Sequence, residues 1–293
     1  MKITLLDAPF GAEVADLDLG WAVAPEDGRA ILAAFRDHAL LLFRGQTLTV
    51  EDQRRLGALL GPLDRRAQVV ELTHEGSGRY DPYVTLITNI RADGKPIGTL
   101  PDGEIWFHAD KSFTAEPFKA LLLYALQVPA TGGTTRFANQ YLAYARLPAP
   151  MRRRIADLRV RQVYDFALSN QDFKPDYRAG TTATALAATH PVAIANPETG
   201  RPQLFVNRLM SAFIEDLAQA EGDALLETLL AASEDPAIVY EHRWRAGDLV
   251  LWDNRAVIHA RTDFPADQIR EMRRITVKGG PLAPAAAALE PAR

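Results

Sequence analysis

The chain has 293 residues and a formal net charge of −4, with 47% apolar and 24% charged residues. This composition is that of an average soluble protein with a sizeable core, and its charge gives no reason to expect binding to nucleic acid or to an anionic membrane. Cysteine is absent, which excludes disulfides, thiolate metal sites and cysteine nucleophiles. The N-terminus has no long apolar segment of the kind a signal peptide needs, and no apolar run reaches the roughly 18–20 residues of a membrane span. We therefore expect a soluble, cytoplasmic protein.

The first hundred residues predict short strands and two helices. We expect strands at residues 2–6, 11–16, 40–43 and 83–90, where β-forming residues are concentrated. Apolar residues at helical spacing predict a helix over 27–41, and a second helix runs from a cap at Thr49 to a stop at Gly61 and Pro62. Polar composition predicts a loop over 63–82. Residues 91–103 predict another loop, placed as a lid beside the segment that follows.

The remainder of the chain is richer in strands. We expect strands at 119–128, 134–138, 161–166, 191–195, 202–207, 238–244, 248–252, 256–260 and 273–278, and helices at 139–146, 151–158 and 214–232. Residues 167–188 contain few large apolar side chains and predict a long mobile loop. Because strands and helices do not alternate as βαβ units, the pattern favours a mainly β fold with inserted helices, a jelly roll or a related barrel. We expect one domain over residues 1–280 and a frayed tail over 281–293.

The segment Ile105-Trp106-Phe107-His108-Ala109-Asp110 carries the clearest chemical signal. Its apolar residues favour a strand, on which His108 and Asp110 would point to the same face. A histidine and a carboxylate placed together need one more ligand to form a facial triad of two histidines and one carboxylate, which is typical of non-haem Fe(II) oxygenases. We predict that the third ligand is His259. The other four histidines have no carboxylate at ligand spacing in a recognisable strand, and we expect them to be structural.

Several motifs, in order, resemble the family of taurine dioxygenase and 2,4-dichlorophenoxyacetate dioxygenase. They are Trp106 to Asp110, residues 129–135 (PATGGTT), residues 247–255 (GDLVLWDNR), His259 and residues 270–276, with 11–13 (GAE) and 42–46 (LFRGQ) near the N-terminus. The resemblance covers most of the chain. It implies a double-stranded β-helix, the jelly-roll or cupin-like fold, and an enzyme that uses Fe(II), 2-oxoglutarate and O2.

The resemblance also implies roles for single residues. His108, Asp110 and His259 match the iron ligands. Thr135 and Arg270 match the hydroxyl and the guanidinium that bind the distal carboxylate of 2-oxoglutarate. Arg274 matches an arginine that binds the anionic end of the primary substrate in several relatives, although its neighbour Arg273 competes for this role. Asn207 and Met210 lie where relatives line the substrate pocket, and Asn254 with Arg255 matches a feature of structural support.

Physical chemistry gives a reason, independent of the family, to expect that Arg270 and Arg274 bind anions. Arg270 and Arg274 have the same parity, so on a strand they share one face, about 13 Å apart at about 3.3 Å per residue. A planar guanidinium binds a carboxylate through two parallel hydrogen bonds better than a lysine does. Two arginines so placed could hold two different anions. We therefore expect a small anionic substrate: a carboxylate, a sulfonate or a sulfate.

The predicted reaction is the hydroxylation of this substrate with release of succinate and CO2, with cleavage of a C–O or C–S bond where the hydroxylated carbon carries oxygen or sulfur. Two alternatives stay open: a metal-dependent hydrolase or isomerase that uses the same three ligands, and a jelly-roll binding protein without turnover. Asp110 argues against a halogenase, in which a small residue replaces the acid. Glu104, and the lack of a sulfonate-binding histidine other than His74 in the 63–82 segment, argue against taurine itself. The family resemblance further implies a homo-oligomer, a dimer or a tetramer.

Overall fold

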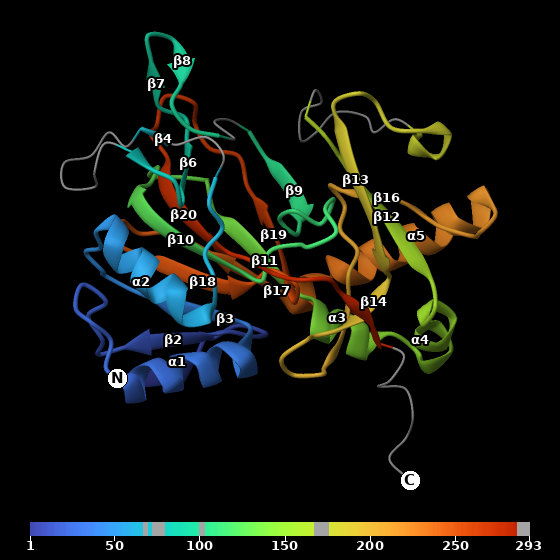
Figure 1. Ribbon diagram of the computed structural model, residues 1–293, viewed down its shortest axis with the longest axis horizontal. Coiled ribbons are helices and arrows are strands. Elements are labelled where there is room, and N and C mark those ends of the chain that lie inside the picture. Colours follow the sequence, from blue (N-terminus) through green and yellow to red (C-terminus); the bar gives the residue numbers. More distant parts are fainter. Residues whose placement is uncertain (67–69, 72–79, 100–102, 167–175, 286–293) are drawn as a thin grey trace.

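The structure is a computed structural model that describes residues 1–66, 70–71, 80–99, 103–166 and 176–285. Within these residues the chain is mainly β with five α-helices, as predicted (Figure 1). Seven strands form the largest sheet: in spatial order β1 (Lys2–Leu5), β2 (Ala12–Ala15), β3 (Leu40–Phe43), β18 (Leu249–Asp253), β10 (Ala120–Gln127), β20 (Glu271–Val277) and β6 (Val84–Thr88).

A second sheet of four strands packs against the first. Its spatial order is β17 (Val239–His242), β11 (Thr135–Asn139), β19 (Val257–Arg261) and β9 (Ile105–His108), all antiparallel. Phe137 and Val257 of this sheet share one apolar cluster with Leu121, Leu123 and Trp252 of the larger sheet. The side chains between the two sheets therefore form one core layer, as expected when two sheets stack face to face.

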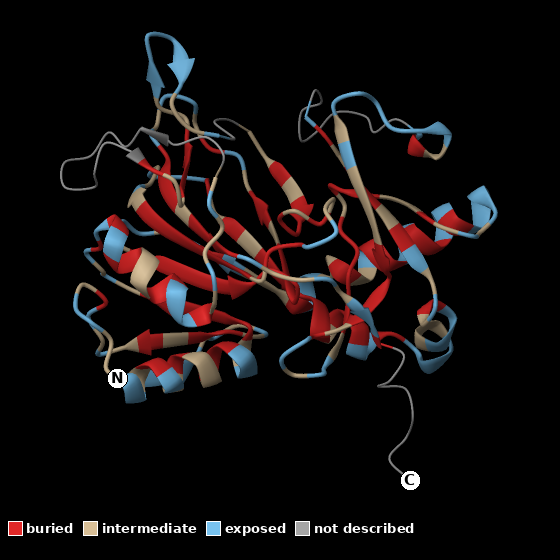
Figure 2. Cartoon of the chain, in the orientation of Figure 1, coloured by how far each residue is buried: buried red, intermediate tan, exposed pale blue. Residues whose placement is uncertain are grey.

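Two helices cover the outer face of the large sheet. They are α1 (Pro25–His38) and α2 (Val50–Leu60), drawn in two shades of blue in Figure 1. Ile31 and Phe35 of α1 and Leu56 of α2 belong to the same apolar cluster as alternate residues of β3, β10 and β18. Figure 2 shows the result: the central strands are red over most of their length, while each helix is buried only on its inner side. Thr49 and Asp52 form the predicted cap of α2, each side chain bonding the other's backbone N–H.

The remaining elements form a second lobe beside the smaller sheet. Two three-stranded sheets, in spatial orders β13-β12-β16 and β15-β14-β21, pack with three helices. The strands are β12 (Arg159–Asp165), β13 (Ala185–Pro191), β14 (Ala193–Ala195), β15 (Pro202–Leu204), β16 (Ser211–Ile214) and β21 (Ala283–Pro284), and the helices are α3 (Gln140–Arg146), α4 (Ala149–Ile155) and α5 (Gln219–Ser233). Short 3-10 turns lie at Tyr177–Ala179 and Pro236–Ile238. Two hairpins, β4 (Val70–Glu71) with β5 (Tyr80–Asp81) and β7 (Arg91–Ala92) with β8 (Lys95–Pro96), complete the described elements. No described helix is long and apolar enough to cross a membrane.

Tertiary pairing overrides local pattern at three places. The helix predicted to end at 41 ends at His38, because Leu40–Phe43 pair with β18 and Ala39 turns the chain in a left-handed conformation. The helix predicted from 214 begins at Gln219, because Ser211–Ile214 pair with β12. Part of the loop predicted over 167–188 is the strand β13, and residues 167–175 lie outside the described residues.

The segment from Pro281 also departs from its prediction where the structure describes it. Ala283–Pro284 pair with β14, and Ala285 is buried in the core of the second lobe. These residues belong to the fold and not to a frayed tail, because they fill the edge of a sheet next to α3 and α5. Residues 286–293 lie outside the described residues.

Candidate metal centre and the cavities beside it

Two histidines face each other on the paired strands β9 and β19, at one edge of the smaller sheet. His108 on β9 and His259 on β19 are direct strand partners, and their ring centroids lie 4.1 Å apart. The Nδ1 of His108 is 2.8 Å from the carbonyl oxygen of Trp106. With Nδ1–H as the donor in this bond, Nε2 keeps its lone pair for a metal ion. The register of a single strand pair thus places two imidazoles at one point.

Asp110 completes the group from a turn rather than from the strand. The prediction that His108 and Asp110 share a strand face is wrong in its geometry, because β9 ends at His108. Instead, the side chain of Asn254 holds the turn: its Oδ1 accepts from the Asp110 backbone N–H at 2.8 Å, and its Nδ2 donates to the Asp110 carbonyl at 2.9 Å. The turn brings an Asp110 oxygen to 3.3 Å from His108 Nε2 and 3.9 Å from His259 Nε2.

The three side chains fit a metal ion by their chemistry. One ligand atom from each of His108, Asp110 and His259 lies within 4.8 Å of the other two. Burial, together with repulsion from His108, lowers the pKa of His259 well below its usual value, so the imidazole is neutral at neutral pH. Burial alone would raise the pKa of the Asp110 carboxyl, but Arg274 and the two imidazoles hold that pKa below its usual range. Two imidazoles and one carboxylate are the ligand set of the facial triad.

A small cavity of about 40 Å³ opens from the metal centre toward Arg270. Its walls come largely from strands of the two facing sheets and include Leu123, Thr135, Trp252 and Arg270. Arg270 is 2% exposed. Its Nε donates to the carbonyl of Gly133 at 3.1 Å, and no described carboxylate forms an ion pair with it. Burial, with repulsion from Arg261, lowers the pKa of Arg270 to about 9. A buried guanidinium without an anionic partner is costly, and the cavity beside it suits a carboxylate ligand.

Thr135 lies in the same cavity with its hydroxyl already oriented. The indole Nε1–H of Trp244 donates to Thr135 Oγ1 at 2.9 Å. Because an indole N–H can only donate, the Thr135 oxygen is the acceptor in this bond and its own proton is free to bond a ligand. Both residues predicted to bind 2-oxoglutarate, Thr135 and Arg270, therefore line one cavity. Trp244 was missed by the sequence reasoning, because only the pairing of β17 with β11 brings it close.

Arg274 and Arg273 lie on opposite faces of β20. Arg274 Nη1 is 2.5 Å from an Asp110 carboxylate oxygen, and Arg274 lines the cavities next to the metal centre. Arg273 instead donates to the Gln53 side chain and to the carbonyls of Leu48 and Thr49, at the start of α2. The structure therefore places Arg274, and not Arg273, on the face of the site.

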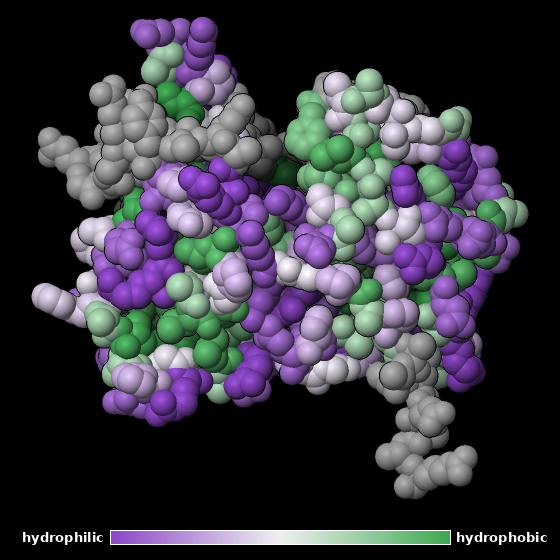
Figure 3. Space-filling view, viewed as in Figure 1, coloured by the Kyte–Doolittle hydropathy of each residue, from purple (hydrophilic) through white to green (hydrophobic). Residues whose placement is uncertain are grey.

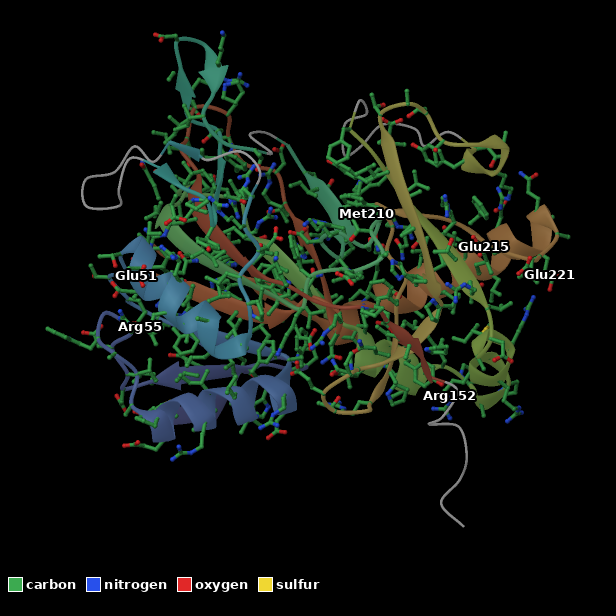
Figure 4. All side chains as sticks on the ribbon, in the orientation of Figure 1. Glu51, Arg55, Arg152, Met210, Glu215 and Glu221 are labelled. Carbon is green, nitrogen blue, oxygen red and sulfur yellow. The ribbon has the colours of Figure 1, made fainter. Side chains whose placement is uncertain are left out.

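A second, larger cavity of about 730 Å³ lies on the other side of His108. Met210 lines it, as predicted, and Figure 4 shows Met210 between β9 and the sheet of β12, β13 and β16. Asn207, which was also predicted to line the substrate pocket, lines neither cavity in the part of the chain that the structure describes. Its amide bonds to Gln162 and to the Met210 backbone N–H, so it supports the turn that carries Met210.

Other predicted residues have structural partners. Glu104, expected to repel a sulfonate, pairs with Arg136 at 3.1 Å and lines neither cavity among the described residues, so the objection based on it falls away. Arg255 pairs with Asp253 at 2.7 Å inside the fold, which agrees with its expected structural role. His74 lies outside the described residues.

Comparison with known proteins gives matches over nearly the whole chain. A model of the family described as "Taurine catabolism dioxygenase TauD, TfdA family" matches residues 2–276. The chain is 31% identical over 291 residues to the (S)-phenoxypropionate/alpha-ketoglutarate-dioxygenase of Sphingobium herbicidovorans, with 95% of each protein covered. It is 30% identical over 277 residues to the alpha-ketoglutarate-dependent 2,4-dichlorophenoxyacetate dioxygenase of Cupriavidus pinatubonensis, covering 91% of this chain and 94% of that protein. Among solved structures, a taurine dioxygenase from Burkholderia xenovorans aligns with a TM-score of 0.77 at 27% identity, covering 99% of both chains.

Proposed function

The chain belongs to the taurine catabolism dioxygenase TauD, TfdA family, and we propose that His108, Asp110 and His259 hold the Fe(II) ion of its 2-oxoglutarate-dependent reaction. The observation that carries this proposal is the convergence of their three ligand atoms within 4.8 Å, at the point where two cavities meet. Family membership favours an oxygenase over a metal-dependent hydrolase or isomerase, and over a binding protein without turnover. Fe(II), 2-oxoglutarate and O2 supply the oxidation that converts a substrate C–H bond to C–OH, with release of succinate and CO2.

The residues of the small cavity bind and orient the cosubstrate. We assign Arg270 to the distal carboxylate of 2-oxoglutarate, because its buried guanidinium has no described anionic partner and can donate two parallel hydrogen bonds. Thr135 donates its hydroxyl proton to the same carboxylate, and Trp244 keeps that hydroxyl in the donating orientation. The apolar walls, among them Leu123 and Trp252, exclude water from the cavity and so strengthen both interactions.

The substrate is an anion held on the other side of the metal ligands. Arg274 lines both cavities, and its guanidinium lies next to Asp110. We assign it to the negative group of the substrate, which positions a neighbouring C–H bond near the iron. The related enzymes named above act on phenoxyalkanoate anions, in agreement with this assignment. Where the hydroxylated carbon carries oxygen or sulfur, its new O–H group allows the C–O or C–S bond to break.

We extend the proposal to the fold and its assembly. The two facing sheets, antiparallel except for the pairing of β2 with β3, support a double-stranded β-helix, and the family match to residues 2–276 supports one oxygenase domain over residues 1–280. The cytoplasmic location and the homo-oligomer, a dimer or a tetramer, stay predictions. Size-exclusion chromatography with light scattering tests the oligomeric state.

An anaerobic binding experiment tests the proposed function. Adding Fe(II) and 2-oxoglutarate to the protein under nitrogen should produce a weak visible charge-transfer band, because the keto acid chelates the metal. His108→Ala should lose the band, while His38→Ala, at the end of α1, should keep it. On admission of oxygen the wild type should release succinate. A wild-type protein that binds Fe(II) without forming the band would refute the proposal.

A further inference from the structure

The large cavity beside the metal ligands has a polar end and an apolar end. It shares Ile105, His108 and Arg274 with the small cavity beside Arg270, which we call the cosubstrate cavity. A molecule inside the large cavity therefore lies against the metal centre. Its volume of about 730 Å³ is within the range of pockets that enclose drug-sized ligands. A two-carbon sulfonate such as taurine would leave most of this space to water. The charge of the polar end and the aromatic lining of the apolar end therefore say more about the size and chemistry of the substrate than family membership does.

The polar end carries an excess of positive charge. Four cations and two carboxylates line it: Arg65, Arg66, Lys111 and Arg274, with Asp64 and Asp110. Lys111 is 3.4 Å from Asp64, and Asp110 is a metal ligand in the proposed function. No described carboxylate forms an ion pair with Arg66, which is half-buried. Once Asp110 is assigned to the metal, the charge of this end is positive.

Arg66 lies where it can act together with Arg274. Its Nη1 donates to the carbonyl of Val84 at 3.4 Å, and the next residue, Thr85, is the direct strand partner of Arg274 in the pairing of β6 with β20. Burial, together with repulsion from the Arg274 guanidinium, lowers the pKa of Arg66. We call Arg66 and Arg274 the arginine pair. Two like charges held together inside a cavity are stabilised by an anion between them.

The apolar end carries a cluster of three aromatic rings, Phe113, Tyr164 and Phe166, which we call the aromatic cluster. The ring centroids of Phe113 and Tyr164 lie 5.3 Å apart and nearly parallel, and Phe166 meets Tyr164 edge to face at 4.8 Å. Phe166 is 60% exposed, and Leu186, the strand partner of Tyr164, is 51% exposed. Figure 3 shows apolar residues gathered along the upper edge of the second lobe. Exposed aromatic surface that lines a cavity is ready to pack against a ligand.

We propose that the substrate is an aryl-bearing anion: the arginine pair binds its negative group, and the aromatic cluster receives its ring. Arg66 is thus a second anchor for the substrate, besides Arg274. This inference rests on the proposed function, because the substrate must present a C–H bond to the metal centre, whose proposed ligand Asp110 lies beside Arg274 at the polar end. A short aliphatic sulfonate would use the polar end alone.

Binding of two matched anions tests the inference without turnover. The protein is loaded with Mn(II) and N-oxalylglycine, an unreactive analogue of 2-oxoglutarate, and titrated with phenoxyacetate or ethoxyacetate in a calorimeter. These two ether carboxylates differ only in the group on the ether oxygen. We expect phenoxyacetate to bind at least about tenfold more tightly, because its ring buries apolar surface against the aromatic cluster.

Three variants separate the contributions of the two ends. Arg66→Gln should weaken both anions about tenfold, because it removes charge-assisted hydrogen bonds. Arg66→Lys should restore part of the loss. Phe166→Ala should weaken phenoxyacetate about fivefold and leave ethoxyacetate unchanged. The controls are Arg153→Gln, an exposed arginine of α4, and Trp21→Ala, an aromatic side chain 74% exposed and outside this cavity. Neither control should change either affinity.

The outcomes distinguish this inference from the proposed function. Equal affinity of the wild type for both anions overturns the aryl assignment, and unchanged affinities in Arg66→Gln overturn the second anchor. A loss of N-oxalylglycine binding in Arg66→Gln also overturns it, because Arg66 would then act on the cosubstrate site. Failure of the proposed function would appear separately, as a wild-type protein that forms no charge-transfer band with Fe(II) and 2-oxoglutarate.

Discussion

The two cavities that meet at His108 are built from different parts of the fold. The cosubstrate cavity is lined mainly by residues of the facing sheets, such as Leu123 on β10, Thr135 on β11 and Trp252 on β18, and each of these strands is paired on both sides. The large cavity is lined mainly by connecting segments, among them residues 64–66, 111–118 and 209–210.

This difference matches the two tasks of the site: binding a cosubstrate that is the same in every related enzyme, and recognising a substrate that differs among them. A strand paired on both sides holds its side chains at fixed spacing, so a cosubstrate that never changes suits a site built on strands. Connecting segments tolerate substitution and insertion more readily, so they suit the recognition of substrates that differ among related enzymes. If the two cavities are independent, a substitution in one of them should leave ligand binding in the other unchanged.

The largest effect is expected at Arg270. Arg270→Gln removes two charge-assisted hydrogen bonds to the distal carboxylate, worth about 3 kcal/mol together, and should raise the Kd of 2-oxoglutarate about 100-fold. The Kd of phenoxyacetate for the Mn(II) protein without cosubstrate should change less than about twofold. Titration of the charge-transfer band and calorimetry measure the two constants. An equal loss of both ligands would show that the cavities are not independent.

Asn254 should affect metal binding, because its side chain holds the turn of Asp110, one of the three proposed metal ligands. Asn254→Ala should lower the affinity for Mn(II) about 10- to 100-fold, the range found when a residue that orients a metal ligand is removed. The signal of free Mn(II) in electron paramagnetic resonance gives the affinity. Gln219→Ala, at the exposed start of α5, is the control. Unchanged metal affinity in Asn254→Ala would mean that the Asp110 turn needs no support.

Gly133 tests how closely the cosubstrate cavity is packed. It has φ +62°, and a Cβ there would lie 3.2 Å from Arg270 Cδ. Gly133→Ala should therefore displace the guanidinium and weaken 2-oxoglutarate binding roughly tenfold, besides costing about 1 kcal/mol of folding stability. Gly94→Ala is a matched control, because Gly94 has φ +75° with no atom within 4 Å of its Cβ position. It should lose similar stability in urea denaturation and no affinity; equal affinity in both variants would contradict the packing argument.

The smallest effect is expected at Trp244. Trp244→Phe keeps the aromatic bulk and removes the N–H that orients Thr135, so KM for 2-oxoglutarate should rise about fivefold while kcat stays unchanged. Trp21→Phe is the control. A change in kcat, or in the affinity for phenoxyacetate, would show that Trp244 acts outside the cosubstrate cavity.

The sequence predicted most strands and the residues that meet at the metal centre, but not how they meet. His108 and His259 were recognisable because the motifs around them follow one another in the order of a known family, whereas a histidine and a carboxylate two residues apart are by themselves a weak signal. The two histidines come together through the pairing of β9 with β19, which no local sequence pattern predicts. Asp110 reached the same point by a turn, since β9 ends one residue before Ala109 and the Asn254 side chain then directs the chain.

The residues that were missed have no local signal. Arg66 lies in a polar segment without periodicity, and it becomes part of the site only because β6 pairs with β20. Asn207 shows the opposite error: it lies close to Met210 in the sequence, yet its amide points into the fold and bonds Gln162. Proximity along the chain does not settle which way a side chain in a turn points.

The sequence by itself predicted that His108, Asp110 and His259 act together and that the fold is mainly β, because residue type, the order of the motifs and local periodicity suffice for these predictions. Only the tertiary structure decided that Arg274 and not Arg273 faces the site, that Trp244 orients Thr135, and that Arg66 joins Arg274. Each of these depends on the register between strands that are far apart in the chain. Register is set by the packing of two whole sheets, and a shift of one residue would turn every side chain of a strand to the other face.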